Sequence, residues 1–249
     1  LLGIEWDTNA LEEAKSNLAD FEERFQYYHG SFVDLGLVVR DWGAKEISGI
    51  LMDLGPSTYQ LTDESRGFTF QKDAPLDMRQ DQNRKLSAAD IVNKFSEKEI
   101  RRILFEGEEK FGRQIAKEIV EERAKKPIQT TRQLVEIIRK ATPPSYRYDR
   151  KTHFATGTFR SLRMAVNSEL ENLQKVLPQA VSVLSPGGRI AIISFHSLED
   201  RIVKQFFKAC QDLEILTNKP IVASIEEIQK NPNARSAKLR GARRLCADY

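Results

Sequence analysis

The sequence contains few of the residues that build disulfide frameworks and metal centres. Among its 249 residues are two cysteines, Cys210 and Cys246, and three histidines. Neither cysteine belongs to a metal-binding or redox motif, so we expect neither a disulfide framework nor a structural zinc site. Unpaired thiols are typical of proteins from a reducing compartment.

Long apolar runs and a strong charge of one sign are also missing. No stretch approaches the roughly 20 apolar residues of a membrane-spanning helix, and no signal-peptide pattern opens the chain. We therefore expect a cytoplasmic protein without a membrane partner. The net charge is only +3, from 39 basic and 36 acidic residues, so a basic surface would require local clustering. A hydrophobic content of 40% is enough for a sizeable core.

Residues 47–60, ISGILMDLGPSTYQ, contain an apolar run that ends in a carboxylate. The run closes at Asp53 and continues into a Gly-Pro-Ser turn. Such a run is typical of a buried parallel strand, and open α/β sheets bind ligands beyond the carboxyl ends of these strands. We therefore expect Asp53 at the rim of a binding crevice, where it would accept hydrogen bonds from an amino or hydroxyl group. A cap for a helix or turn is the alternative.

The start of the chain has a similar pattern. Its apolar residues end at Glu5, and a helix capped by Asp7 or Thr8 follows. In a nucleotide-binding α/β domain, an acid at this point accepts hydrogen bonds from both ribose hydroxyls, whereas a surface glutamate is the alternative. A second short strand, residues 25–28, leads to Phe32, whose ring would either lie against an adenine or belong to the core.

Residues 60–81 have no sustained periodicity and predict a long polar loop rich in arginine and aromatic residues. Loops of this length are usually disordered or functional, and this one follows the candidate carboxylate directly. We expect Arg66 and Arg79 to hold phosphate. The aromatic residues Phe68 and Phe70 would stack on a base, as in proteins that bind single-stranded nucleic acid.

Residues 86–150 carry only helical patterns. Ser96 with Glu99, and Thr130 with Gln133, form capping boxes ahead of apolar residues at helical spacing. The segment has 15 Lys and Arg against 11 Asp and Glu, which allows a basic face but also fits an ordinary solvated helix surface. We predict an all-helical insertion within the α/β domain.

The last hundred or so residues return to mixed patterns. Apolar residues over 159–177 predict one amphipathic helix that ends in a turn at Pro178. A strand over residues 189–195 follows, and then a helix capped by Ser197. His196, between the two, is a candidate donor or acceptor in the crevice, or equally a satisfied structural histidine. The neighbouring Ser and Asp do not make a hydrolase triad, whose members converge from separate elements.

The sequence ends in a basic segment. Residues 231–249 contain five Lys and Arg and one acidic residue, separated mostly by small residues. We interpret this segment as a tail that contacts phosphate, which contributes affinity without sequence specificity, although a solvated terminus is the alternative. The candidate contacts are Arg235, Lys238 and Arg240.

Several motifs occur in the same order over nearly the whole chain: GIEWD, HGSF, GILMDLGPS, RGFTF, DAPLDMR, AADIVN, ATGTFRSLRMAVNSEL, SPGGRIAIISFHSLEDRIVK, LTNKP and NARSAKLR. Together they resemble one family, the bacterial 16S ribosomal RNA cytosine-N4 methyltransferases. ISFHSLEDR and DAPLDMR are its most specific motifs.

The resemblance implies a class I S-adenosylmethionine-dependent methyltransferase, with a Rossmann-like α/β sheet. Residues 1–85 and 151–249 would form the discontinuous methyltransferase domain, and residues 86–150 an all-helical RNA-binding insertion. The family's first strand and glycine-rich loop would precede Leu1, so we expect an N-terminally truncated chain with an incomplete cofactor pocket. The implied partner is the 16S ribosomal RNA in the small ribosomal subunit, and a homodimer is as compatible with the sequence as a monomer.

The implied reaction moves a methyl group from S-adenosylmethionine to the exocyclic N4 of a cytidine in the decoding region. By position in the motifs, Glu5 would hold the ribose, Phe32 would lie near the adenine, and Asp53 and Gln60 would complete the cofactor pocket. By analogy with the Asp/Asn-Pro-Pro-Tyr turn of amino-methylating enzymes, Asp53 would also accept an amino hydrogen of the cytosine, and Tyr59 is a candidate for stacking on the flipped base. The expected RNA contacts are Arg66, Arg79, His196, Arg235, Lys238 and Arg240.

Two other functions fit parts of this pattern. A chain without the glycine-rich loop would be a catalytically silent RNA-binding fragment that lacks a complete cofactor pocket. A nicotinamide-dependent oxidoreductase would use a similar sheet, but nothing in the sequence supplies a partner for hydride transfer or a second phosphate site. Binding of S-adenosylmethionine separates the methyltransferase from the silent fragment.

Overall fold

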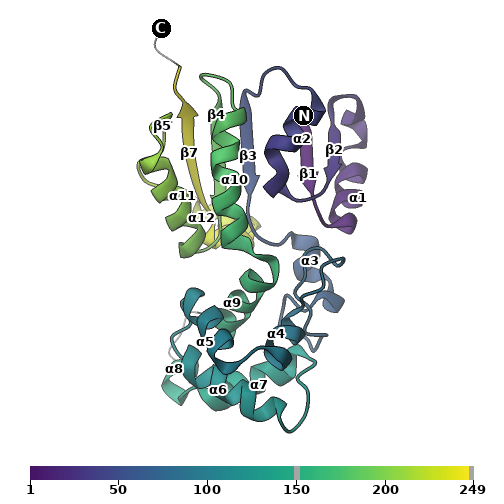
Figure 1. Cartoon of the computed structure of the whole chain (residues 1–249), viewed down its shortest axis with the longest axis vertical. Helices are drawn as coiled ribbons and strands as arrows, with labels where there is room; N and C mark the ends of the chain where they lie inside the picture. Colours follow the sequence, from purple (N-terminus) through teal and green to yellow (C-terminus); the bar gives the residue numbers. More distant parts are fainter. Residues whose placement is uncertain (149–151, 247–249) are drawn as a thin grey trace. The chain divides into compact units, whose positions relative to one another are not determined.

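The computed structural model describes residues 1–148 and 152–246, which divide into two compact units. We call them the sheet unit, made of Leu1–Trp6, Lys15–Gly55 and the chain from Glu169 onward, and the helical unit, made of Asp7–Ala14 and Pro56–Ser168. In Figure 1 the purple and yellow ends of the chain belong to the sheet unit, and the teal middle belongs to the helical unit.

The sheet unit contains two sheets. A two-stranded parallel sheet pairs β1 (Leu2–Glu5) with β2 (Gln26–His29). A five-stranded sheet has the order β3 (Gly49–Asp53), β4 (Arg189–Ser194), β7 (Lys238–Arg244), β5 (Leu213–Ile215), and β6 (Ile221–Val222) also pairs with β7. The strands predicted at the start of the chain, before Asp53 and before His196 are all confirmed, and the α/β class with them.

The basic segment at the end of the chain is not the tail that we expected. Its residues Lys238–Arg244 form β7, which lies between β4 and β5 and is antiparallel to both. Small residues make this position possible, because Gly241 and Ala242 are buried in the sheet while the arginines around them alternate between its faces. These residues are therefore a strand of the sheet and not a solvated tail, and contact of their cations with phosphate stays a prediction.

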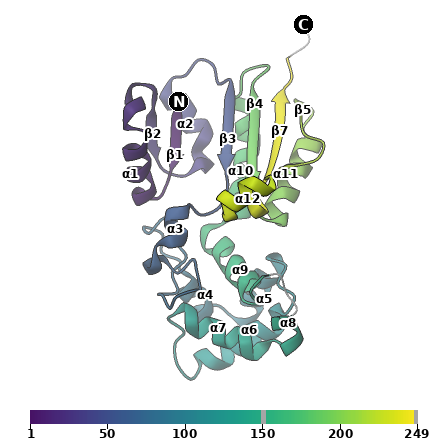
Figure 2. The same ribbon diagram turned by 180° about the vertical axis from the view of Figure 1, so that it is seen from behind.

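Helices cover one face of the sheets. Figures 1 and 2 show α2 (Leu35–Trp42), α10 (Glu169–Val183) and α11 (Ser197–Ala209) on the same side of the strands. The other helices associated with this unit are α1 (Thr8–Asn17), which begins in the helical unit, α12 (Ile225–Lys230), and the 3₁₀-helices η1 (Ala19–Arg24), η2 (Phe32–Asp34) and η4 (Pro232–Ser236). The core includes Val176, Leu177 and Ala180 of α10, Ile190 and Ile192 of β4, and Val203 of α11.

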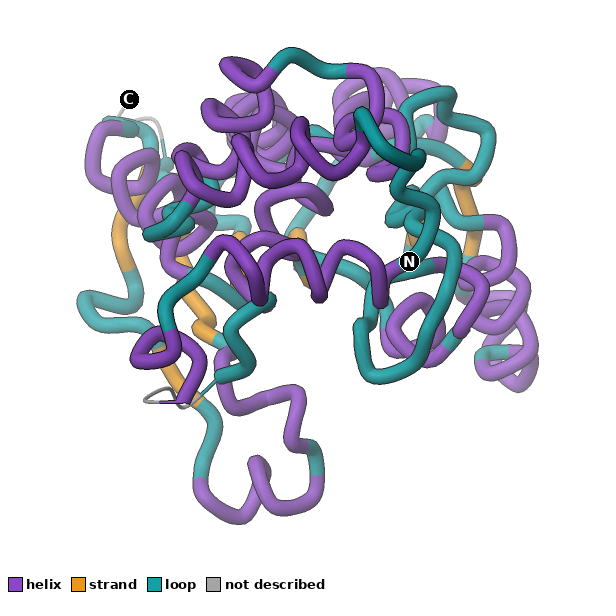
Figure 3. Tube along the Cα trace, turned by 90° about the horizontal axis from the view of Figure 1, so that it is seen from below, coloured by secondary structure: helices purple, strands orange, loops and turns teal. Residues whose placement is uncertain are grey.

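The helical unit is built from helices and loops, as Figure 3 shows by colour. Its described elements are α3 (Thr58–Thr62), η3 (Glu64–Arg66), α4 (Ala88–Lys94), α5 (Glu97–Glu106), α6 (Gly112–Arg123), α7 (Thr131–Ala141), α8 (Pro144–Tyr148) and α9 (Thr156–Asn167), together with the start of α1. Both predicted capping boxes are present: Ser96 and Glu99 begin α5, and Thr130 and Gln133 begin α7. Among the described residues, no helix is long and apolar enough to cross a membrane.

This unit is larger than the insertion expected at residues 86–150. Leu76 and Met78 from the preceding loop, and Phe159 and Leu162 from the following helix, are buried in the same core as α4 to α7. Apolar burial therefore places the loop, which has no helical pattern, and α9, which was predicted as part of a helix outside the insertion, with the helices. Residues 149–151, at the upper limit of that insertion, lie outside the described residues.

The helix predicted over residues 159–177 is two helices. Ser168 has a left-handed backbone, with φ of 53°, and separates α9 from α10. Phe159 and Leu162 belong to the core of the helical unit, whereas Leu173 and Leu177 belong to the core of the sheet unit. The apolar spacing continues across two helices because each half faces a different core. The expected end at Pro178 is also wrong, because α10 includes Pro178 and continues to Val183.

Candidate active site at the carboxyl edge of the sheet unit

The candidate site residues of the sheet unit share one edge. Glu5 ends β1 opposite His29 of β2, and Asp53 ends β3 opposite Ile193 of β4. Because these strands run in the same direction, their carboxyl ends meet at the lower edge of the sheet unit in Figure 1. Antiparallel β7 starts at this edge, with Lys238 paired to Ser194. The sequence-based expectation that these acids follow strands is confirmed.

Asp53 is an exposed carboxylate without a partner. Its side chain makes no hydrogen bond or ion pair with any residue that the structure describes. Partial desolvation, and then the negative charge of Glu199, raise the pKa of Asp53 above its usual value. The chain leaves the strand through Gly55, whose φ of 93° favours glycine. Asp53 can therefore accept a hydrogen bond and a proton from a ligand.

Glu5 and Phe32 have the chemistry that a nucleoside requires. Glu5 is half-buried at the end of β1, and its carbonyl oxygen accepts a hydrogen bond from the backbone N–H of Gly30 at 2.9 Å. Phe32 begins η2 and is partly buried, with its ring centroid 6.3 Å from that of Trp6. A carboxylate offers two acceptors to a cis-diol, and an aromatic face suits an adenine. These residues fit S-adenosylmethionine in donor and acceptor type.

His196 begins α11, one residue earlier than the Ser197 cap that we expected. The backbone N–H of Glu199 donates to His196 Nδ1 at 3.4 Å, while Glu199 Oε2 accepts from the N–H groups of Phe195 and His196, at 2.9 and 3.3 Å. His196 therefore replaces the usual Ser or Thr of a capping box. With its side chain 6% exposed, His196 has a structural position rather than one on an RNA-binding surface.

Glu169 lies near this cap, and one ligand atom each from Glu169, His196 and Glu199 falls within 4.8 Å of the others. The carboxylate of Glu199 accepts two backbone N–H groups, and His196 Nδ1 accepts a third. The cap accounts for the positions of His196 and Glu199.

Gln60 lies in the helical unit, and both ends of its amide are used there. Its Oε1 accepts from the backbone N–H of Ser57 at 3.0 Å, and its Nε2 donates to Asp7 Oδ2 at 2.7 Å. The side chain is buried. Gln60 therefore stabilises the start of α3, and its role in the cofactor pocket stays a prediction.

Arg66 occupies the same buried cluster. Its Nη2 donates to Asp7 Oδ2 at 2.8 Å and to the carbonyl oxygens of Arg79 and Gln80. The Arg66 side chain is 1% exposed, so its role as a surface cation for phosphate was predicted wrongly. The predicted cap at Asp7 is confirmed, because its Oδ1 accepts a hydrogen bond from the N–H of Asn9, in the first turn of α1, at 3.0 Å.

The rest of the loop at residues 60–81 is structural too. Arg79 donates to both carboxylate oxygens of Asp77 and to the carbonyl oxygens of Gln82 and Arg84, so most of its guanidinium donors have partners within the protein. Phe68 is buried, and Phe70 packs against Phe159 with ring centroids 4.9 Å apart. These side chains have partners within the protein, and the phosphate contact by Arg79 and the base stacking by these rings stay predictions. The loop supplies apolar side chains to the helical core.

The three cations predicted as contacts in the basic segment have different environments. Arg235 is exposed in η4 and has no hydrogen-bond or ion-pair partner among the described residues. Arg240 is buried and donates from Nε to Asp200 Oδ1 at 2.7 Å, and Lys238 Nζ lies 3.6 Å from the other oxygen of the same carboxylate. The structure therefore leaves Arg235 freely accessible, and it engages Arg240 with an acid that the sequence analysis did not single out.

Asp200 and Glu199 were missed for different reasons. Glu199 stands three residues after His196, the spacing of a capping box, but histidine is not an expected cap and the signal was overlooked. No local signal pairs Asp200 with Arg240, because the two residues are 40 positions apart and meet only when β7 adds to β4.

Comparison with known proteins identifies the family of the chain. The MraW methylase family model matches residues 1–245. The chain is 50% identical to ribosomal RNA small subunit methyltransferase H of Kosmotoga olearia, over 98% of this chain and 83% of that protein. Proteins of the same name from Persephonella marina, with 48% identity over 98% of this chain and 84% of theirs, and from Thermosipho melanesiensis, with 50% over 98% and 83%, are also similar. The match extends over nearly all of the chain, and the chain therefore belongs to the MraW methylase family.

Proposed function

We propose that this chain transfers a methyl group from S-adenosylmethionine to the exocyclic N4 of a cytidine in the decoding region of 16S ribosomal RNA. Family membership supports methyl transfer, and the printed names of the relatives support ribosomal RNA of the small subunit as the substrate. The nitrogen and its position in the RNA are the finer part of the proposal.

The observation that carries this proposal is the unpartnered carboxylate of Asp53 at the end of β3. The lone pair of a cytosine amino group is delocalised into the ring, so the nitrogen is a weak nucleophile. An acceptor that binds one amino hydrogen localises the lone pair and can take up the proton when the new N–C bond has formed. An acid with a raised pKa is a better proton acceptor near neutral pH than an ordinary aspartate.

The other residues of the edge contribute binding. Glu5 would hold the ribose hydroxyls of S-adenosylmethionine and Phe32 would lie along its adenine. When bound, this cofactor supplies a methyl group on a positively charged sulfur. Because transfer to nitrogen is a direct displacement, the protein accelerates it mainly by holding the two reactants in line and excluding water.

The proposed RNA-binding role of the helical unit draws support from α5. Lys98, Arg101 and Phe105 follow one another at steps of three and four, so they share one face of this helix. Neither cation has an ion-pair partner among the described residues, and Phe105 is 81% exposed. Cations beside an exposed aromatic ring are the usual elements of a surface that binds single-stranded RNA.

The silent-fragment alternative gains no support from the comparisons, because the relatives align over 98% of this chain and 83% of their own length or more. An oxidoreductase would not match the MraW methylase family model over residues 1–245.

The proposed function is tested with small ribosomal subunits that lack the modification. Radiolabelled S-adenosylmethionine, the 249-residue chain and these subunits are incubated together, and the RNA is digested and analysed by mass spectrometry. We expect one methyl group per subunit on N4 of a cytidine. Methylation of carbon 5, of the ribose, or of protein alone would contradict the proposal, and calorimetry with S-adenosylmethionine separates failure of cofactor binding from failure of RNA recognition.

A further inference from the structure

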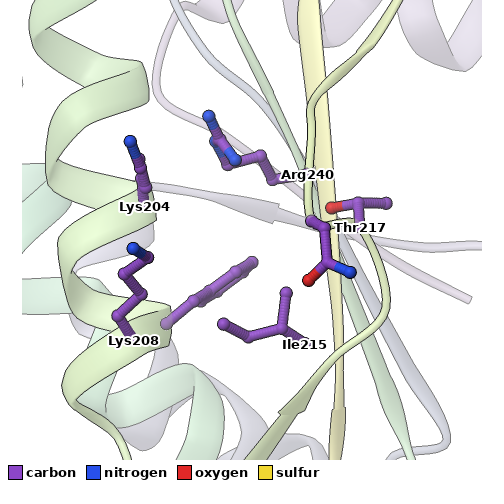
Figure 4. A pocket seen from close by; sticks show the side chains of 7 residues that line it. Lys204, Lys208, Ile215, Thr217 and Arg240 are labelled. Atoms are coloured by element: carbon purple, nitrogen blue, oxygen red, sulfur yellow. The ribbon is translucent and has the colours of Figure 1, made fainter.

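A shallow pocket in the sheet unit combines cations on one side with a polar loop on the other. It has a volume of about 40 Å³, and its lining consists of Lys204, Phe207 and Lys208 of α11, Ile215, Thr217 and Asn218 of β5 and the loop after it, and Arg240 of β7. Figure 4 shows the two lysines on the helix side, Ile215 and Thr217 on the strand side, and Arg240 between them.

The two lysines are not neutralised within the protein. Lys204 and Lys208 are exposed, and neither forms an ion pair with a residue that the structure describes. They are four residues apart on α11, a spacing at which two like charges repel each other and destabilise a helix. Other helical lysines of the surface form an ion pair with an acid four residues earlier, as Lys94 does with Asp90 and Lys175 with Glu171.

Arg240 adds a buried cation with unused donors. Asp200 accepts from Nε at 2.7 Å and from Nη2 at 3.3 Å, and no described residue accepts from Nη1. The same carboxylate also faces Lys238 at 3.6 Å. Asp200 therefore faces two cations, and the two lysines of the pocket face no acid among the described residues, so the pocket keeps a positive charge that an anion would neutralise.

The opposite wall holds these donors in place. Thr217 Oγ1 accepts from the backbone N–H of Gly241 at 2.9 Å, which fixes the loop against β7 next to Arg240. Phe207 is buried, so the helix side of the pocket rests on the core. The donors thus belong to α11 and β7, two elements that are packed together, unlike those of a flexible lysine-rich segment.

We propose that this pocket binds a phosphate of the RNA backbone, outside the edge that carries Asp53. The inference rests on the proposed function, because it takes the anion from the substrate RNA. A pocket of this volume and openness accommodates one phosphate group and leaves the rest of a chain outside. Lys204, Lys208 and Nη1 of Arg240 supply charge-assisted hydrogen bonds to it.

The test compares two double variants with equal loss of charge. Lys204→Ala/Lys208→Ala removes the pocket lysines, and Lys45→Ala/Lys175→Ala removes two exposed lysines of the same unit that do not line the pocket. The probe is a fluorescent single-stranded oligocytidine, and its dissociation constant is measured over a range of KCl concentrations. Circular dichroism and thermal unfolding verify that both variants fold.

For the pocket variant we expect roughly tenfold weaker binding at low salt and a salt dependence less steep by about 1.4 logarithmic units, the value for two lost contacts to a single strand. The control should keep the slope of the original chain. Lys204→Arg/Lys208→Arg, which retains the charge, should restore both quantities.

Three results would overturn the proposal: the same slope and affinity in the pocket variant and the control, no salt dependence of binding by the original chain, or displacement of the RNA by inorganic phosphate at an equal phosphate concentration. The last result would assign the pocket to a free anion. Methylation of small subunits is measured in parallel. A chain that does not methylate the subunits, but whose RNA binding keeps the expected salt dependence, would refute the proposed function and not the pocket.

Discussion

The two units differ in how their charged side chains are paired. On the helical unit several lysines and acids at the surface are paired, such as Lys117 with Glu121, and Lys125 and Lys140 with Glu122. The sheet unit leaves Asp53 at its carboxyl edge, and Lys204 and Lys208 beside the pocket, without partners among the described residues. A charged side chain that is paired within the protein is less available to a ligand, so the unpaired charges are the stronger candidates for function.

Asp7 and Asp53 show this contrast most clearly, since both follow a strand. Burial raises the pKa of each, but Asp7 accepts hydrogen bonds from Gln60, Arg66 and Asn9, which together with the charge of Arg66 leave its pKa below the usual value. Asp53 has no such donors, and Glu199 raises its pKa further. Position at the end of a strand therefore does not distinguish the two acids, whereas the absence of donors does, and it is the reason that Asp53 is the one proposed as the proton acceptor.

The largest effect on stability should come from Asp7→Ala. This change leaves the guanidinium of Arg66, with a side chain 1% exposed, without its carboxylate. Breaking a buried ion pair in this way costs on the order of 3 to 5 kcal/mol of the free energy of unfolding. Asp53→Ala is the matched control, and its effect should stay within about 0.5 kcal/mol. Urea denaturation measures both, and equal losses in the two variants would contradict the contrast between the two acids.

Arg240→Ala should be the next most disruptive change. It leaves Asp200, 13% exposed, facing only the more distant Lys238. Loss of a hydrogen-bonded charge of this kind costs about 2 kcal/mol. Lys208→Ala removes an unpaired cation from the same pocket, so its effect on the free energy of unfolding should be negligible. A larger loss from Lys208→Ala than from Arg240→Ala would show that the pairing is assigned wrongly.

The pH dependence of stability should separate the two acids in sign. The folded pKa of Asp7 lies below its unfolded value, so its contribution is complete above about pH 4 and is lost as the pH falls through the folded pKa. The advantage of the original chain over Asp7→Asn should therefore shrink in acid. The raised pKa of Asp53 acts in the opposite direction, so Asp53→Asn should gain slightly at neutral pH and lose that gain in acid.

The smallest effect concerns Glu199, whose negative charge contributes to the raised pKa of Asp53. Glu199→Gln keeps an acceptor for the N–H groups of Phe195 and His196 but removes the charge. The acidic limb of the methylation rate profile should shift to lower pH, because the pKa of Asp53 falls. An unchanged limb would mean that Asp53 does not titrate in the reaction.

Local patterns predicted the strands before Glu5, Asp53 and His196, the helical middle of the chain and both capping boxes, because each depends on residues close in sequence. Ser168 was missed, since a left-handed serine interrupts no apolar spacing. The uses of Arg66 and Gln60 were missed because their partner Asp7 is 59 and 53 residues away. An arginine in a polar loop has the same sequence signature whether it binds phosphate or closes a buried cluster, and only the fold distinguishes the two.

The most direct test of the central claim is methyl transfer by Asp53→Asn under single-turnover conditions, with S-adenosylmethionine at saturation and its affinity measured by calorimetry. The amide keeps the shape and one acceptor oxygen but takes up a proton poorly. We expect a rate about 10² to 10⁴ times lower, the usual contribution of a general base, with cofactor affinity unchanged. A full rate in Asp53→Asn at unchanged affinity would contradict the assignment of Asp53 as the acceptor of the amino proton.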